Sequence, residues 1–266
     1  MLLNISHTTS YTYDAPIDYA LQQLRLRPKE TAGQRIVSWA IGIEGGKIET
    51  SFTDHHNNQV DLISFAPKTT YISVKCEGAI ETVDKAGVVG NHAGFAPLSL
   101  FKRSTPLTRP GAELRKLARE VASHDEAPIP MLHRLNSAVL ENLAYKKNQT
   151  SSSTKAEDAL LQGEGVCQDH AQVFVSAARQ IGFPARYVSG FLLLEDAIEQ
   201  DAGHAWAEAY VDGIGWVGFD PPHEKCPDAS YVRVATGLDS YDAAPIRGLV
   251  RGEVQEELVV NVQVQQ

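Results

Sequence analysis

The chain has 266 residues, of which 43% are hydrophobic and 21% are charged, and its formal net charge is −9. This composition is that of an ordinary soluble globular protein, long enough for two domains of the usual size. The acidic balance argues against nucleic acid as a partner, because phosphate backbones are bound by clustered Lys and Arg. No stretch approaches the ~18 apolar residues of a membrane span, and the amino terminus lacks the basic flank and apolar run of a signal peptide. We therefore expect a cytoplasmic protein that binds neither nucleic acid nor membranes; its oligomeric state is not readable from these features.

Residues 5–83 alternate between apolar and polar positions, as strands do. Two short segments, Gly45-Gly46 and Asn57-Asn58, have the composition of hairpin loops between such strands. We therefore predict an N-terminal β-sandwich domain over residues 1–104.

Residues 84–111 hold glycines and prolines without a sustained period, which indicates a loop or linker between domains. The period then becomes helical, and two helices are predicted from apolar faces at Leu114, Leu117, Ala118 and Val121 and at Leu132, Leu135, Val139 and Leu143. Thr154 and Glu157 have the spacing of a capping box for a short helix through Leu161. The second domain is expected to span residues 105–266. Its alternating end, 258–264, is expected to join a sheet, with the first domain's sheet as one candidate.

The cysteines are Cys76, Cys167 and Cys226, an odd and widely spaced set that predicts reduced thiols rather than disulfides. Cys167 follows the glycine-rich turn Gly163–Gly165 and opens a predicted amphipathic helix. Free N–H groups and the helix dipole at such a position favour a thiolate and can bind an oxyanion. Taken alone, the position favours a small buried structural cysteine.

A second element makes the catalytic interpretation stronger. His204 opens a predicted strand through Val211, and the return strand ends at Asp220. A three-residue loop would pair Val211 with Gly215 and place Asp220 diagonal to His204 on one face, within hydrogen-bonding reach. A two-residue loop would turn the acid to the other face. A nucleophile at a helix start, with a base and an orienting acid on a hairpin, is what acyl transfer by a thiolate–imidazolium pair needs.

These segments resemble the bacterial transglutaminase-like proteins. The resemblance is carried by Gly163–Ala171, Pro184–Gly190, His204–Trp206 and Phe219–Pro221, and also by His7–Tyr13, Leu24–Pro28 and Ala244–Gly248. It implies an α+β fold, in which the sandwich precedes a papain-like transglutaminase core. It also implies that Cys167 is the nucleophile, His204 the general base and later acid, and Asp220 the residue that orients the imidazole.

The function expected from this resemblance is hydrolysis of a peptide or amide bond in a protein or peptide substrate. A transglutaminase that uses an amine acceptor and a non-catalytic scaffold are the alternatives. Neither a cofactor nor a metal is expected. Tyr145, Gln168 and Trp206 are secondary candidates for the oxyanion site or cleft, although Tyr145 and Trp206 also fit ordinary core packing. Zinc ligands were a further alternative, drawn from Cys167, His170, His204, Asp220 and His223, or from His55-His56.

Overall fold

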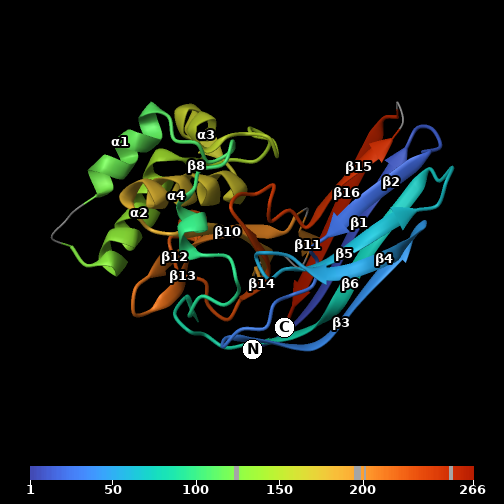
Figure 1. The fold of residues 1–266 in the computed structure, drawn as a ribbon, viewed down its shortest axis with the longest axis horizontal. Coiled ribbons are helices and arrows are strands. Elements are labelled where there is room, and N and C mark those ends of the chain that lie inside the picture. The colour runs from blue at the N-terminus through green and yellow to red at the C-terminus, as the bar shows by residue number, and fades with distance from the viewer. Residues whose placement is uncertain (123–125, 195–198, 201, 252–253) are drawn as a thin grey trace.

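The computed structural model describes residues 1–122, 126–194, 199–200, 202–251 and 254–266 and has a mixed α+β fold (Figure 1). The helices are η1 (Leu98–Lys102), α1 (Ala112–Val121), α2 (Pro128–Asn142), α3 (Ala156–Gln162), α4 (Cys167–Ile181) and η2 (Pro221–His223). The first strands are β1 (Leu2–Tyr13), β2 (Tyr19–Leu24), β3 (Gln34–Glu44), β4 (Gly46–Thr53), β5 (Gln59–Phe65), β6 (Tyr71–Thr82), β7 (Val88–Gly90), β8 (Ala144–Tyr145) and β9 (Glu164–Gly165). The later strands are β10 (Ala185–Leu192), β11 (Glu199–Gln200), β12 (His204–Val211), β13 (Gly215–Phe219), β14 (Tyr231–Gly237), β15 (Ile246–Arg251) and β16 (Glu256–Gln265).

Two sheets form the sandwich on the right of Figure 1, with strand orders β11-β16-β1-β6-β3 and β15-β2-β5-β4. Alternate side chains of these strands meet between the sheets in an apolar core that includes Tyr11, Leu24, Ile63 and Ile72. The last two strands return to this sandwich: β15 pairs with β2, and β16 pairs with β1 over a register that joins Asn4 to Gln265. The two ends of the chain therefore lie side by side.

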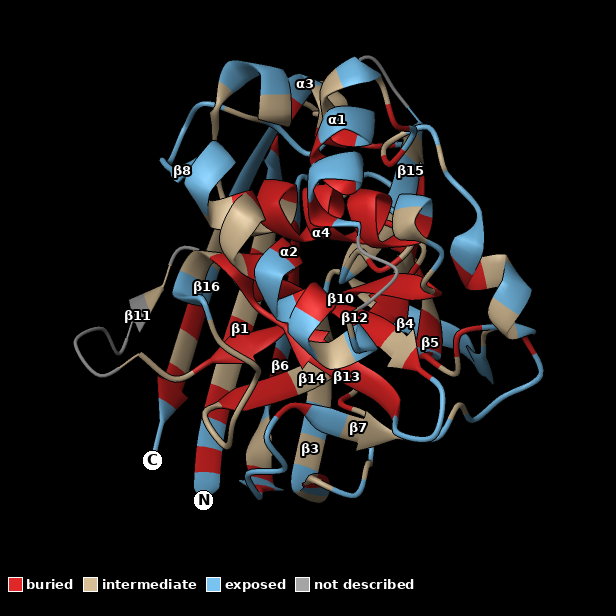
Figure 2. Ribbon diagram, turned by 90° about the vertical axis from the view of Figure 1, so that its left-hand side faces the viewer, coloured by how far each residue is buried: buried red, intermediate tan, exposed pale blue. Residues whose placement is uncertain are grey.

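The third large sheet has the order β14-β10-β12-β13-β7 and contains β12, which begins at His204. Its small residues Ala207 and Ala209 pack against α4, and the other helices complete that apolar core. On the opposite face, Phe191, Val232 and neighbouring side chains pack against Leu3, Ile5 and Val262 of the sandwich. The sheet is buried on both faces, which Figure 2 shows as red strands beneath the helices. Every residue of β10 is accordingly buried, including the polar Arg186 and Ser189.

Two expectations about loops need correction, and a third is confirmed. Gly45-Gly46 is not a hairpin loop, because β3 and β4 belong to different sheets and the turn crosses between them. Residues 84–111 are not without regular structure, since β7 forms the edge of the third sheet and η1 follows it. Asn57-Asn58 does lie in a hairpin, the one between β4 and β5.

The predicted capping box of the short helix is also wrong. Lys155 is the N-cap of α3, and the carboxylate of Glu157 instead accepts hydrogen bonds from the backbone N–H groups of Gly111, Glu113 and Leu114. It thus caps α1, whose first N–H groups have no partner within the helix. Among the described residues, no helix combines the length and apolarity needed to cross a membrane.

Candidate active site

Cys167 is the first residue of α4, as the sequence predicted. The helix start is fixed by Asp169, whose Oδ2 accepts hydrogen bonds from Val166 N at 2.8 Å and from the Thr150 hydroxyl at 2.6 Å. Cys167 is half-buried and lines a cavity of about 280 Å³ together with Gln168 and His204. The thiol therefore faces both the free N–H groups of a helix N-terminus and an open cavity.

His204 and Asp220 meet because β12 and β13 have the register of the three-residue loop. Val211 pairs with Gly215, and both Gly213 and Gly215 have positive φ, at 80° and 98°. Glycine adopts these angles without the steric penalty of a Cβ. His204 Nε2 consequently lies 2.8 Å from Asp220 Oδ2.

The other side of the His204 ring faces the thiol of Cys167. Burial by itself lowers the pKa of His204, but hydrogen bonds and charges of Asp220 and Cys167 outweigh burial and raise the pKa to about 9. An imidazole in this setting holds its proton at neutral pH, and it lines the same cavity as Cys167. The three predicted residues are thus brought together in the order Cys167, His204, Asp220.

Asp220 has two further partners. Its Oδ2 accepts hydrogen bonds from His223 Nδ1 at 2.8 Å and from the Tyr231 hydroxyl at 2.6 Å. Burial raises the pKa of Asp220, yet the bonds from His204, His223 and Tyr231 together hold it well below its usual range. Sequence reasoning missed Tyr231, because β14 lies outside the hairpin and its pairing with β10 carries no local motif.

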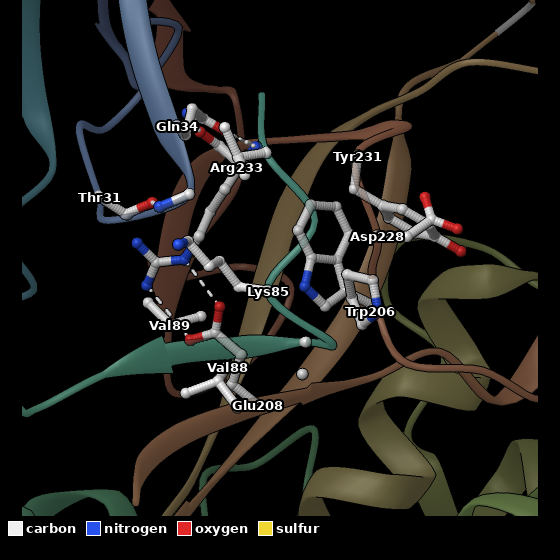
Figure 3. Close-up of a pocket in the computed structure, with 15 residues that line it drawn as sticks. Thr31, Gln34, Lys85, Val88, Val89, Trp206, Glu208, Asp228, Tyr231 and Arg233 are labelled. Atoms are coloured by element: carbon white, nitrogen blue, oxygen red, sulfur yellow. Dashed lines mark hydrogen bonds and ion pairs between the residues drawn. The ribbon is translucent and has the colours of Figure 1, made fainter. Parts of the chain in front are cut away.

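The secondary candidates lie at different places. Tyr145 is half-exposed on β8. Partial burial, followed by the charges of Cys167 and Asp220, raises the pKa of its hydroxyl, so Tyr145 lies near the start of α4. Gln168 lines the cavity of Cys167 and also an adjoining cavity of about 750 Å³. Trp206 is buried, stacks on His204 with ring centroids 6.1 Å apart, and lines a separate smaller cavity with Glu208 (Figure 3).

Several of the candidate zinc ligands are engaged by other groups of the protein. His170 is buried with Nδ1 2.9 Å from Val166 O and Nε2 2.7 Å from Leu143 O, so both ring nitrogens are occupied by carbonyls rather than aimed at Cys167. His204, Asp220 and His223 form one group with converging ligand atoms, which the two bonds to Asp220 Oδ2 explain.

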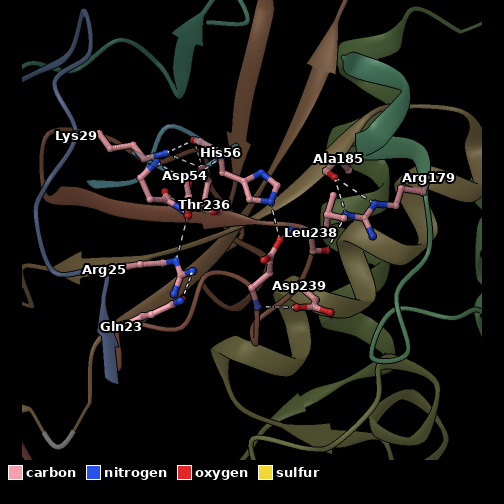
Figure 4. Close-up of polar contacts among 12 residues, drawn as sticks. Gln23, Arg25, Lys29, Asp54, His56, Arg179, Ala185, Thr236, Leu238 and Asp239 are labelled. Carbon is pink, nitrogen blue, oxygen red and sulfur yellow. Dashed lines mark hydrogen bonds and ion pairs between the residues drawn. The ribbon is translucent and has the colours of Figure 1, made fainter. Parts of the chain in front are cut away.

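A second group with converging ligand atoms comprises His55, His56 and Asp242, where His56 Nε2 is 2.6 Å from Asp242 Oδ2. Figure 4 shows this contact between the β4–β5 turn and the segment after β14.

Two family models, both of transglutaminase-like proteins, match this chain. Residues 3–81 match the bacterial transglutaminase-like N-terminal region, and residues 115–221 match the transglutaminase-like superfamily model, a range that includes the three residues described above. Two relatives are uncharacterized proteins. That from Mycobacterium bovis is 25% identical over 287 residues, covering 98% of this chain and 90% of the relative. That from Mycobacterium leprae is 24% identical over 275 residues, covering 98% of each.

A similar solved structure is that of a candidate cysteine protease from Cytophaga hutchinsonii. It superposes with a TM-score of 0.76 at 20% identity, and the match covers 100% of this chain and 98% of the other. At this identity the likeness establishes the fold, a sandwich joined to a transglutaminase-like core.

Proposed function

Because the chain belongs to the transglutaminase-like superfamily, we propose that it is a thiol-dependent enzyme that breaks an amide or peptide bond through Cys167, His204 and Asp220. The observation that carries this proposal is that Cys167, at the start of α4, lines the same cavity as His204, which is hydrogen-bonded to Asp220. A substrate carbonyl in that cavity lies next to the nucleophile, the proton carrier and the helix N-terminus at once.

In the first half-reaction, the Cys167 sulfur attacks the carbonyl carbon and forms a tetrahedral intermediate. The free backbone N–H groups in the first turn of α4 stabilise the oxyanion, since the helix dipole favours negative charge there. His204 donates its proton to the leaving amine as the C–N bond breaks, and a thioester on Cys167 remains. Asp220 keeps the ring oriented and stabilises its charged form.

In the second half-reaction, His204 is neutral and takes a proton from water as the water oxygen attacks the thioester. The C–S bond breaks, the acid leaves, and the sulfur and imidazolium are restored. An amine that takes the place of water gives a new amide instead, which is the transglutaminase reaction. The two cavities beside Cys167 share Gln168, Tyr187 and Ser189, so an acceptor has a separate approach to the acyl group.

The first test is mass spectrometry after brief, limiting iodoacetamide treatment of the native protein at neutral and mildly acidic pH. Burial raises the pKa of Cys76 to about 12 and raises that of Cys226, so both thiols are expected to label slowly. Fast labelling confined to Cys167, persisting in acid and reduced by His204→Ala, is the expected result. Equal, slow labelling of all three thiols, unchanged by the substitution, contradicts the proposal and favours the scaffold alternative.

A second test separates hydrolysis from amine transfer. Once Cys167 shows the expected labelling, the protein is incubated with peptide substrates, with and without a primary amine, and the products are identified by mass. Free acid in both samples supports the hydrolase, whereas an amine adduct that replaces the acid supports the transglutaminase. A Cys167→Ser variant is the control and is expected to form neither product.

A further inference from the structure

A cleft of about 470 Å³ lies between the sandwich and the third sheet, and three basic side chains line it. Lys29 comes from the segment between β2 and β3, whereas Arg186 lies on β10 and Arg233 on β14. The cleft shares no lining residue with the cavity of Cys167. It is therefore a separate feature, built jointly by both parts of the fold.

The positive charge around this cleft exceeds the negative charge that is paired with it. Glu208 is fully buried and lies 2.6 Å from Arg186 Nε and 2.7 Å from Arg233 Nε, as Figure 3 shows for Arg233. One carboxylate thus serves two guanidinium groups, and Lys29 adds a third cation. Glu30 also lines the cleft, but its side chain is exposed and it forms no ion pair with these cations in the described part of the chain.

Several donors at the cleft have no anionic acceptor. Arg186 is buried, stacks on Trp216 at 3.8 Å, and bonds Glu208 only through Nε, so that among the described residues its terminal nitrogens have no acceptor. Lys29 Nζ donates only to neutral oxygens, His56 O at 2.7 Å and the Thr236 hydroxyl at 2.8 Å (Figure 4). In the described part of the chain, no nitrogen of Arg186 or Lys29 is both buried and without a hydrogen-bond partner, so the donors left over are open to the cleft and can bind a ligand.

The electrostatics of Lys29 agree with this geometry. Burial, followed by the charges of Arg233 and Arg186, lowers the pKa of Lys29 well below its usual value. An anion placed among the three cations removes the like-charge repulsion and accepts the free N–H groups. The planar fork of Arg186 suits two oxygens of a phosphate or carboxylate, and Lys29 adds a point charge.

We propose that this cleft is a binding site for a small oxyanion, of the phosphate or polycarboxylate class, held by Lys29, Arg186 and Arg233. Because Lys29 belongs to the sandwich and the arginines to the third sheet, the bound anion links the two parts of the fold and stabilises their contact. The site is independent of the proposed chemistry at Cys167.

The test uses the whole chain in thermal unfolding and isothermal titration calorimetry with phosphate, sulfate and citrate, each compared with chloride at equal ionic strength. We expect saturable binding at one site per chain. At about 100 times the dissociation constant, linkage raises Tm by about 5–10 °C. Lys29→Met is expected to weaken binding about tenfold or more, and Lys29→Arg to restore most of it. The strongest of the three anions identifies the class.

Lys75→Met is the matched control, since Lys75 is an exposed lysine of the sandwich that pairs with Glu77. It should bind the anion like the wild type. Absence of saturable binding to the wild type overturns the proposal without reference to any variant. Equal binding by wild type and Lys29→Met overturns it as well, because the anion then sits elsewhere. If Lys29→Met fails to fold, Lys29→Gln takes its place: anion binding by Lys29→Gln equal to that of Lys75→Met contradicts the site.

Discussion

Replacing Tyr231 by phenylalanine tests the part of the site that the sequence did not reveal. The Tyr231 hydroxyl donates to Asp220 Oδ2 at 2.6 Å, alongside His204 and His223. The substitution keeps the ring, which packs edge-on against Trp206 with centroids 5.4 Å apart, and removes only the hydroxyl. Any effect is therefore attributable to one hydrogen bond to a buried carboxylate.

The magnitude follows from that bond. A hydrogen bond to a charged group contributes about 1.5–3 kcal/mol, and two of the three donors to Asp220 remain. We expect the free energy of unfolding at neutral pH to fall by about 1.5 kcal/mol. The hydroxyl also holds the carboxylate in position against His204; if about 1.4 kcal/mol of that positioning is lost, alkylation of Cys167 slows by about tenfold.

The pH dependence gives a readout that loss of packing alone would not produce. Burial raises the pKa of Asp220, but its hydrogen-bond donors hold that pKa below the usual range, so its stabilising contribution is present above the unfolded-state pKa. The contribution is lost as pH falls through the lower, folded-state pKa. Without the Tyr231 hydroxyl the folded-state pKa rises, so the acid loss of stability is smaller and is complete at a higher pH.

Urea unfolding across an acid pH series, together with iodoacetamide labelling, measures both effects. Tyr241→Phe is the matched control, because Tyr241 is exposed and its ring lies 3.8 Å from the Arg247 guanidinium without contacting Asp220. It should match the wild type in both assays. A Tyr231→Phe protein with unchanged acid stability and labelling rate would refute the reasoning.

Three further predictions concern the framework of the site, each measured by urea unfolding. Glu157→Ala leaves three backbone N–H groups at the start of α1 without their acceptor and should cost about 2 kcal/mol. The neighbouring Asp158→Ala removes an exposed side chain and should cost under about 0.5 kcal/mol. Equal effects would contradict the capping role. Gly213→Ala, with φ at 80° and open space around its Cβ, should cost about 1–2 kcal/mol. Gly215→Ala, at φ 98° with its Cβ overlapping a backbone oxygen of β7, should cost about 2 kcal/mol more, and a ranking in the opposite order would refute this. Burial raises the pKa of Glu208, but its two arginine partners lower it to about 2. Its contribution to the free energy of unfolding is therefore present above pH 4.5, the usual pKa of a glutamate, and is lost as pH falls towards 2. Glu208→Gln should flatten that acid slope and cost about 3–5 kcal/mol at neutral pH, and an unchanged slope would count against the pairing.

The local elements were readable from the sequence because their signals are local. The apolar period around Leu117 and Leu135 predicted α1 and α2, and the glycine turn before Cys167 predicted the start of α4. For the β12–β13 hairpin the sequence left two loop lengths open, and the structure has the three-residue loop, whose register brings Asp220 to His204. The alternation of residues 5–83 predicted the sandwich, and the family resemblance added the expected roles of Cys167, His204 and Asp220.

What the sequence left open depends on contacts between segments far apart in the chain. The Glu157 carboxylate caps α1 rather than its own helix because packing brings the start of α3 against the start of α1, 44 residues earlier at Glu113. Tyr231 reaches Asp220 only because β14 pairs with β10, and Lys29 meets Arg186 and Arg233 only because the sandwich packs on the third sheet. Periodicity and spacing describe neighbours along the chain, so they predicted α1, α2 and the start of α4. Only the tertiary structure decided which carboxylate caps which helix, what supports Asp220, and where the buried cations gather.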